Sequence, residues 1–138
     1  MTNTSFPFRR IMVVEDEPFL LKIISTVLRA DAPEVDIVLA GDGVEAIEKL
    51  KEFTPDLLLV DVLMPNMDGI SFVKHLQQHQ ATADIPVIFA TAMAEEVNFQ
   101  PILKQHNVVG VISKPYSVET LVPRLTQMVS EYLDARSV

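Results

Sequence analysis

Short runs of apolar, often β-branched residues recur along the chain at fairly regular intervals. Each run is four to six residues long and is flanked by more polar segments. Runs of this length and composition are typical of strands that are buried within a sheet. The pattern predicts five strands, at residues 11–14, 35–40, 57–60, 86–90 and 108–112.

The segments between these strands repeat apolar residues at the three- and four-residue steps of a helix. In the first segment Leu20, Ile24 and Val27 fall on one side, and Pro18 stands where a first helical residue needs no N–H. Helices are predicted at residues 18–30, 43–53 and 69–78, between the last two strands, and from residue 117 onward. This alternation indicates an α/β fold, a doubly wound, five-stranded parallel sheet with helices on both faces.

Two prolines disturb the last two helical segments. A helix cap at Asn98 places Pro101 in the first turn, where the missing N–H costs no hydrogen bond. Pro123 lies beyond the first turn of a helix capped by Ser117. We therefore expect Pro123 to kink the last helix or to delay its start.

The composition bounds the location of the protein and its partners. A length of 138 residues suits one domain, expected over residues 9–133 between a flexible extension at 1–8 and a tail at 134–138. No apolar run approaches the roughly 20 residues of a membrane span, and cysteine is absent, which together fit a cytoplasmic protein. A net charge of −8 without a Lys/Arg cluster argues against direct nucleic-acid binding.

Several polar residues directly follow the predicted strands. In an open parallel sheet, ligands bind at the edge formed by the carboxyl ends of the strands. The residues at these ends are Glu15, Asp16 and Glu17 after the first strand, Asp61 after the third, Thr91 after the fourth and Lys114 after the fifth. We expect these side chains to converge on one rim, although they are far apart in the sequence.

Three or four carboxylates in one small pocket repel one another, and a hard divalent cation such as Mg²⁺ relieves that repulsion. A carboxylate beside such an ion can act as a nucleophile and form an acyl phosphate. Lys114 would supply a positive charge, and Thr91 a hydroxyl donor, for the oxygens of the transferred group. The set therefore predicts phosphoryl transfer to Asp61 with Mg²⁺ as cofactor.

Each of these residues also has an ordinary structural explanation. Taken alone, residues 15–17 fit a solvated helix start, Asp61 fits a turn, and Lys114 fits a surface cation. Only their combination, each at its own strand end, is specific. His75 and His79 are spaced like a helical zinc pair but lack the Glu of that motif, so they are interpreted as structural surface residues.

Four stretches of the chain match a known family pattern. They are Val13-Val14-Glu15-Asp16-Glu17-Pro18, Asp61-Val62-Leu63-Met64-Pro65-Asn66-Met67-Asp68-Gly69, Thr91-Ala92 and Lys114-Pro115. With them the chain resembles the receiver domain of two-component response regulators, from about Arg10 to about Leu133, in a stand-alone, single-domain form. The resemblance implies a flavodoxin-like strand order, 2-1-3-4-5.

The resemblance also implies how the acidic residues act. Asp61 would accept the phosphoryl group from a phosphohistidine on a sensor histidine kinase or a histidine phosphotransfer protein. Asp16 would bind Mg²⁺ directly, and Glu15 would act largely through water. Asp61 itself and the backbone carbonyl of Leu63 would complete the ligands that the protein supplies.

The remaining matching residues are implied to serve the switch. Thr91 would bond the phosphoryl group and be drawn inward, and Lys114 would bridge to Asp61 or its phosphate. Ala92 would leave space for phosphoryl access. Pro115 would take the cis peptide bond that is common in the family.

One position departs from the family pattern. Three residues before the lysine, where a Tyr or Phe is frequent, this chain has Val111, which cannot make the same exposed-to-buried swing. The output is expected to be phosphorylation-dependent binding of an unknown downstream protein or a phosphorelay step. The departure motivates an alternative, a pseudo-receiver scaffold that binds partners without phosphorylation control.

Enzymatic alternatives fit the residues less well. A flavin carrier needs a Ser/Thr/Gly-rich loop after the first strand, but the acidic loop at residues 15–18 would repel a phosphate. A phosphatase of the haloacid dehalogenase type needs a second Asp two residues after its nucleophile, where this chain has Leu63. Self-catalysed gain and loss of the phosphoryl group is expected, without a dedicated enzymatic activity.

Overall fold

The computed structural model describes residues 7–64, 66–92, 100–114 and 117–136. The strands are β1 Arg10–Val14, β2 Asp36–Ala40, β3 Leu57–Asp61, β4 Val87–Thr91 and β5 Val108–Ser113. The helices are α1 Pro18–Asp31, α2 Gly43–Leu50, α3 Gly69–Gln77, α4 Gln100–Leu103 and α5 Leu121–Arg136. All strand pairs are parallel and the order is β2-β1-β3-β4-β5, which confirms the predicted fold.

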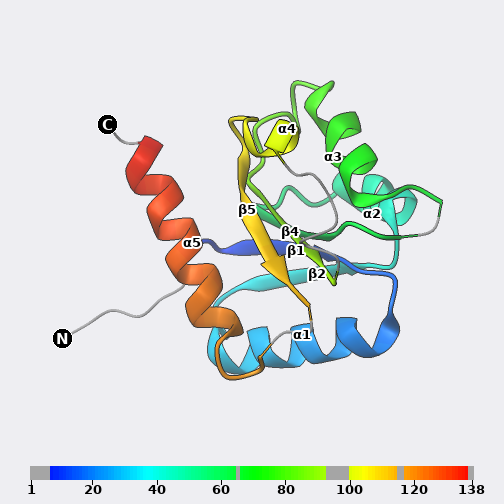
Figure 1. Cartoon of the computed structure of the whole chain (residues 1–138). Helices are drawn as coiled ribbons and strands as arrows, with labels where there is room; N and C mark the ends of the chain where they lie inside the picture. Colours follow the sequence, from blue (N-terminus) through cyan, green and yellow to red (C-terminus); the bar gives the residue numbers. More distant parts are fainter. Residues whose placement is uncertain (1–6, 65, 93–99, 115–116, 137–138) are drawn as a thin grey trace.

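The helices cover the two faces of the sheet, with α1 and α5 on one face and α2 and α3 on the other (Figure 1). The alternation of side chains along β1 shows this division. Ile11 and Val13 pack in the core on the α1/α5 side, whereas Met12 and Val14 pack on the α2/α3 side. A parallel strand covered on both faces must be apolar at every position, which is why these strands are continuous apolar runs.

Caps and prolines set the ends of the helices. Pro18 is the first residue of α1, as predicted, and the Glu17 carboxylate caps the helix by accepting the Leu20 N–H at 3.1 Å. Helix α5 starts only at Leu121, later than a helix capped by Ser117 would, because Pro123 has no N–H to continue the bonding that the Leu121 N–H begins with the Ser117 carbonyl at 2.9 Å. Pro123 therefore stands in the first turn, where its missing N–H leaves no helical bond unmade.

Some boundaries differ from the expected ones. Helix α4 begins at Gln100 with Pro101 in its first turn, and the proposed cap, Asn98, lies outside the described residues. Helix α5 continues to Arg136, past residue 133, and Phe8 packs against the core. Within the described ranges, no helix is both long and apolar enough to cross a membrane.

Candidate functional site

The third strand delivers Asp61 to the carboxyl edge of the sheet. Asp61 is the last residue of β3, and its exposed fraction is only 4%. The loop that follows turns back closely, because the Gly69 N–H donates to the Val62 carbonyl at 2.8 Å. A β-carbon at position 69 would collide with the Asp61 carbonyl, so only glycine fits there. Asp68 then caps α3 by accepting the Ser71 N–H at 2.8 Å.

The first strand delivers two adjacent carboxylates with opposite exposure. Glu15 is 1% exposed, whereas Asp16 is exposed to solvent. The Glu15 N–H donates to the Ala40 carbonyl at 3.0 Å, which extends the β1–β2 pairing by one residue. The Glu15 carboxylate in turn accepts the Glu17 N–H at 3.1 Å. The backbone and the side chain of Glu15 therefore both hold the turn from β1 into α1 in place.

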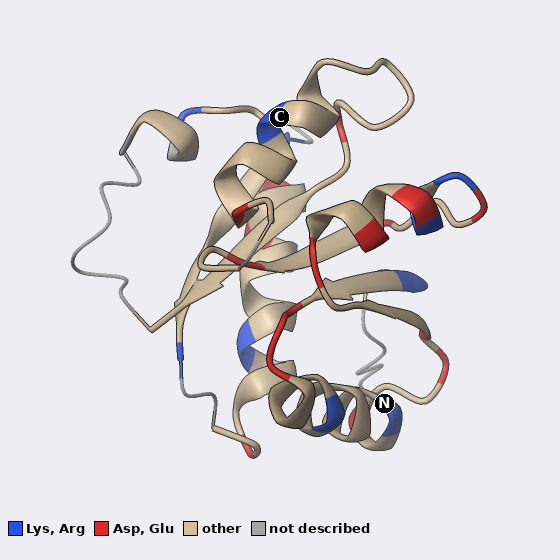
Figure 2. Cartoon of the chain, turned by 90° about the vertical axis from the view of Figure 1, so that its right-hand side faces the viewer, with Lys and Arg blue, Asp and Glu red and all other residues tan. Residues whose placement is uncertain are grey.

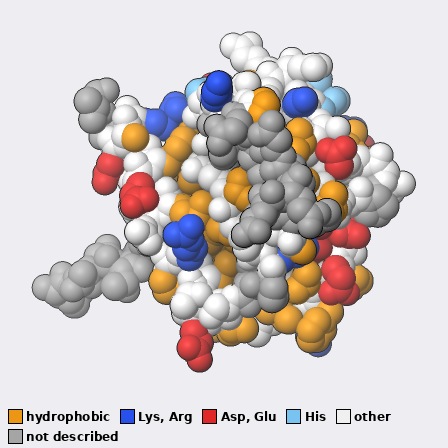
Figure 3. Space-filling view, viewed as in Figure 1, with side chains coloured by type: hydrophobic (Ala, Val, Ile, Leu, Met, Phe, Trp, Pro, Cys, Tyr) orange, Lys and Arg blue, Asp and Glu red, His pale blue; other side chains and the backbone are white. Residues whose placement is uncertain are grey.

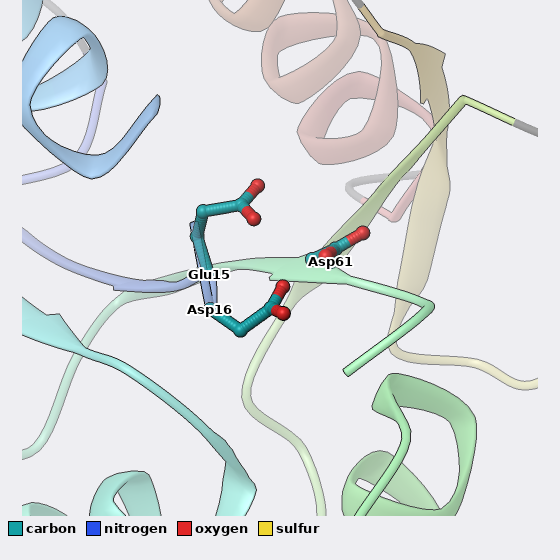
Figure 4. Close-up of side chains that lie close together, drawn as sticks. All are labelled: Glu15, Asp16 and Asp61. Carbon is teal, nitrogen blue, oxygen red and sulfur yellow. The ribbon is translucent and has the colours of Figure 1, made fainter. Parts of the chain in front are cut away.

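The three carboxylates meet at the adjoining ends of β1 and β3 (Figure 4). One oxygen each from Glu15, Asp16 and Asp61 lies within 4.8 Å of the others. The Lys114 ammonium enters from the end of β5, with Nζ 2.7 Å from Glu15 Oε1 and 3.3 Å from Asp61 Oδ1. Its backbone N–H donates to the Thr91 carbonyl at 3.0 Å, which holds the two strand ends together. Glu15, Asp16, Asp61 and Lys114 thus come together, whereas the Glu17 carboxylate, also expected at this rim, caps α1 instead.

The electrostatics of the pocket follow from burial and crowding. Burial, reinforced by the negative charge of Glu15, raises the pKa of Asp61 from 3.8 to about 7, although Lys114 acts in the opposite direction. Burial by itself would lower the pKa of Lys114, but its contacts with Glu15 and Asp61 outweigh burial and raise it. The lysine therefore stays charged, while Asp61 is poised between its protonated and ionised forms near neutral pH.

The donor set fits a small, hard divalent ion. All three side chains offer carboxylate oxygens, and Mg²⁺ prefers oxygen ligands at about 2.0–2.1 Å in octahedral geometry. Opposite ligands of such an ion are about 4.2 Å apart, and adjacent ones closer, so the 4.8 Å cluster needs to contract only slightly. One lysine cannot neutralise three carboxylates, which leaves a net negative pocket for a cation. Asp16, Asp61 and Glu15 are the side chains that would hold it.

The other predicted residues take the following positions. Thr91 ends β4 with no exposed surface, and Ala92 follows it with its side chain exposed. Leu63 lies two residues after Asp61 with half of its side chain exposed, and the role of its carbonyl stays a prediction. Val111 in β5 is partly buried against the core on the α2/α3 side. Pro115 lies outside the described residues.

Two supporting residues were missed by sequence reasoning. Gly69, part of the motif but given no role, is required by the close approach of the Asp61 carbonyl. Asn66 adopts a left-handed conformation with φ of 69°, and its amide donates to Asp42 Oδ2 at 3.1 Å. The hydrogen bond ties the loop after β3 to the cap of α2. A glycine directly after an N-capping Asp, and an Asn directly after a proline between a strand and a helix, were the available signals.

The family model for the response regulator receiver domain matches residues 11–126. The chain belongs to this family. Among curated relatives, the receiver is 38% identical over 117 residues to the phosphate regulon transcriptional regulatory protein PhoB of Escherichia coli, covering 85% of this chain and 50% of that one. It is 37% identical over 120 residues to hybrid signal transduction histidine kinase D of Dictyostelium discoideum, covering 87% and 8%. The chain thus spans half or less of these relatives' length.

Solved structures of receiver domains share the fold. The receiver domain of the Francisella response regulator 1452 superposes with a TM-score of 0.74 at 26% identity, covering 89% of this chain and 98% of that one. The receiver domain of sensor histidine kinase PA1611 from Pseudomonas aeruginosa, at 24% identity, matches with the same TM-score of 0.74 over 88% and 98%. That structure has a magnesium ion coordinated in its active site cleft. This second likeness shows the fold alone.

Proposed function

We propose that Asp61 of this receiver accepts a phosphoryl group from a phosphohistidine, with Mg²⁺ bound by Asp16, Asp61 and, through water, Glu15. The observation that carries the proposal is the meeting of these three carboxylates with Lys114 at one end of the sheet. Family membership supports the same chemistry. The proposed function is signalling, without a dedicated enzymatic activity.

The chemistry at Asp61 is a displacement at phosphorus. A carboxylate oxygen of Asp61 forms the new P–O bond as the P–N bond to the donor histidine breaks, and the leaving nitrogen keeps the electron pair. A bound Mg²⁺ supplies positive charge that keeps the carboxylates ionised and offsets charge on the phosphoryl oxygens. Lys114, 3.3 Å from Asp61, is placed to pair with one of those oxygens. The buried Glu15 holds the lysine there.

An apolar surface on α1, the helix that follows the acidic residues 15–17 in the chain, suits a helical phosphodonor. Phe19, in the first turn of α1, is 67% exposed, and Val118, shortly after Lys114, is 55% exposed. With Ile23 and Val27 they line one shallow hollow. Figure 3 shows hydrophobic side chains gathered at the lower edge of the molecule, where α1 lies. A sensor histidine kinase or a histidine phosphotransfer protein is the proposed partner at this surface.

The charge distribution supports a protein rather than a nucleic acid as the downstream partner. Lys and Arg are dispersed among acidic positions rather than gathered on one face (Figure 2). A nucleic-acid surface needs a concentrated basic patch to replace the counterions of the phosphates. The proposed output is therefore phosphorylation-dependent binding of a protein, or transfer of the phosphoryl group onward in a relay.

Val111 is the observation that favours a second function. It is partly buried in β5 where the family often carries an aromatic ring. A pseudo-receiver scaffold would bind its partner equally well with and without phosphate. Retention of the acidic pocket and Lys114 weighs against it, because a scaffold does not need a cluster that costs stability.

The test is incubation with a small phosphodonor and Mg²⁺, followed by intact mass spectrometry. We expect one phosphoryl adduct in the wild type, none in Asp61→Asn, and a normal adduct in the matched control Asp31→Asn, which alters an exposed carboxylate at the end of α1. An adduct that persists in Asp61→Asn would refute the assignment. Absence of both the adduct and Mg²⁺ affinity in the wild type would favour the scaffold.

A further inference from the structure

Two histidines lie side by side at the end of α3, and neither belongs to the acidic pocket. His75 is in the last turn of the helix, and the His79 N–H donates to the Leu76 carbonyl at 3.2 Å, so the chain keeps turning past the helix end. The two rings have centroids 4.7 Å apart and planes inclined by 44°. Figure 3 shows histidine side chains at the surface in the upper part of the molecule.

A backbone contact decides which nitrogen of His79 is available. Its Nδ1 lies 3.0 Å from the His75 carbonyl oxygen. A carbonyl can only accept a hydrogen bond, so Nδ1 must carry the proton. In the neutral ring the lone pair therefore resides on Nε2. Histidines that bind metals are commonly oriented in this way, with one ring N–H donated to a backbone carbonyl and the other nitrogen directed at the ion.

The spacing of the rings also suits a shared ion. Transition metals bind imidazole nitrogens at about 2.0–2.1 Å, so two rings on adjacent positions of one ion have centres roughly 4.5–5 Å apart. The observed 4.7 Å falls in this range before any ion is bound. The two rings are therefore near enough to share one ion once their free nitrogens are turned toward it.

The surroundings of the two rings oppose a cation only weakly. The rings border a shallow hollow whose apolar lining comes from Ile47, Leu50 and Leu76. Lys51 also lines this hollow, and its positive charge opposes a cation. Its ammonium is paired with Glu48 at 2.9 Å, which offsets much of that charge.

We propose that His75 and His79 form a binding site for a transition-metal dication of the Ni²⁺, Cu²⁺ and Zn²⁺ class. The two imidazoles supply the protein ligands and water fills the remaining positions, because neither histidine joins a group of three or more potential ligands among the described residues. Nitrogen ligands select these ions, whereas the all-oxygen pocket at Asp61 selects Mg²⁺. The receiver would then hold two chemically distinct ion sites, and an ion at the second would fix residue 79 to the end of α3.

The site is tested by titrating the untagged chain with Ni²⁺ in the presence of saturating Mg²⁺, which keeps the acidic pocket occupied. Calorimetry measures the stoichiometry, and NMR follows the histidine ring signals. We expect about one equivalent of Ni²⁺ to bind. The signals of His75 and His79 should change, while those of His106, which pairs with Asp84 elsewhere on the surface, should not.

Variants separate this site from the others. His75→Gln and His79→Gln should each weaken Ni²⁺ binding about tenfold or more, whereas His106→Gln should leave it unchanged. Asp61→Asn should also retain Ni²⁺ binding while losing the phosphoryl adduct, so the two proposals fail independently. The proposal is wrong if the wild type shows neither heat nor ring shifts, if the double variant His75→Gln/His79→Gln binds as tightly, or if Asp61→Asn abolishes binding.

Discussion

At the carboxyl edge of the sheet, Glu15 and Asp61 are buried as like charges that share one cation, Lys114, and the pKa of Asp61 is raised to about 7. At the opposite edge, Asn107 is equally buried, but its amide accepts from Gln77 at 2.9 Å and donates to the Ile85 carbonyl at 3.0 Å. At the carboxyl edge the buried carboxylates repel each other, whereas at the opposite edge the buried amide has its hydrogen bonds made. Buried like charges of this kind are typical of functional sites, and their unfavourable energy is offset by stabilising contacts elsewhere in the fold.

Removing the shared cation should have the largest effect on stability. Lys114→Met leaves Glu15 and Asp61 buried without their positive partner, which should lower the free energy of unfolding by about 3–5 kcal/mol at pH 8 without Mg²⁺. Mg²⁺ should restore part of this loss because it supplies charge to the same carboxylates. Urea denaturation with and without Mg²⁺ measures both effects. Lys74→Met, on the exposed side of α3, is the matched control, and an equal loss there would contradict the explanation.

Removing one of the conflicting charges should stabilise the metal-free protein. The folded-state pKa of Asp61 is about 7, above its ordinary 3.8, so the folded state binds this proton more tightly than the unfolded state does. The contribution of Asp61 to the free energy of unfolding is therefore most favourable below about pH 4 and is lost as the pH rises through about 7. At pH 8, Asp61→Asn should raise the free energy of unfolding by about 2–4 kcal/mol.

The pH profile provides the control for that prediction. The difference in stability between Asp61→Asn and the wild type, measured without Mg²⁺, should be large at pH 8 and shrink toward pH 4. Adding Mg²⁺ at pH 8 should also shrink it, because the ion stabilises only the wild-type pocket. A difference that is constant across this pH range would show that ionisation of residue 61 is not the cause.

At the opposite edge, truncating Asn107 should lower the free energy of unfolding, and Mg²⁺ should not change the size of that loss. Asn107→Ala leaves the Ile85 carbonyl and the Gln77 amide without their partner, at a cost of about 1–3 kcal/mol. The same denaturation experiment should give this loss with and without Mg²⁺. If Mg²⁺ reduced the loss of stability in Asn107→Ala, the two edges would be energetically coupled, and the difference drawn between them would be wrong.

The sequence predicted the carboxyl edge better than the amino edge for a physical reason. Strand ends can be located from apolar runs, and the parallel topology then brings Asp61 and Lys114 together whatever the details of packing. The opposite exposures of the neighbours Glu15 and Asp16 depend on how the chain turns into α1, which periodicity does not reveal. Pro123 signalled a disturbance, but only the packing of α5 shows that the helix starts late.

The contacts of the opposite edge, where the strands begin, could not be predicted because they join residues far apart in the sequence and depend on the exact register of the strands. Asn107 meets Gln77 across 30 positions of sequence, and neither residue type signals a buried partner. The β4–β5 pairing shifts register between Val87 and Ile88, and that shift is not visible in two apolar runs. Where function demands particular residues the sequence is informative, and where stability needs only some satisfied pair it is not.

The smallest expected effect lies at the end of α5, where two donors share one acceptor. The Tyr132 hydroxyl donates to the His106 carbonyl at 3.0 Å, and Arg136 donates to the same oxygen at 3.2 Å. Tyr132→Phe should therefore cost only about 0.5 kcal/mol, since the carbonyl keeps its second partner. Replacing Arg136 by Met as well should cost more than the two single losses added together, because only then has the carbonyl lost both of its side-chain donors. Strictly additive losses in this double-mutant cycle would show that the two donors do not substitute for each other.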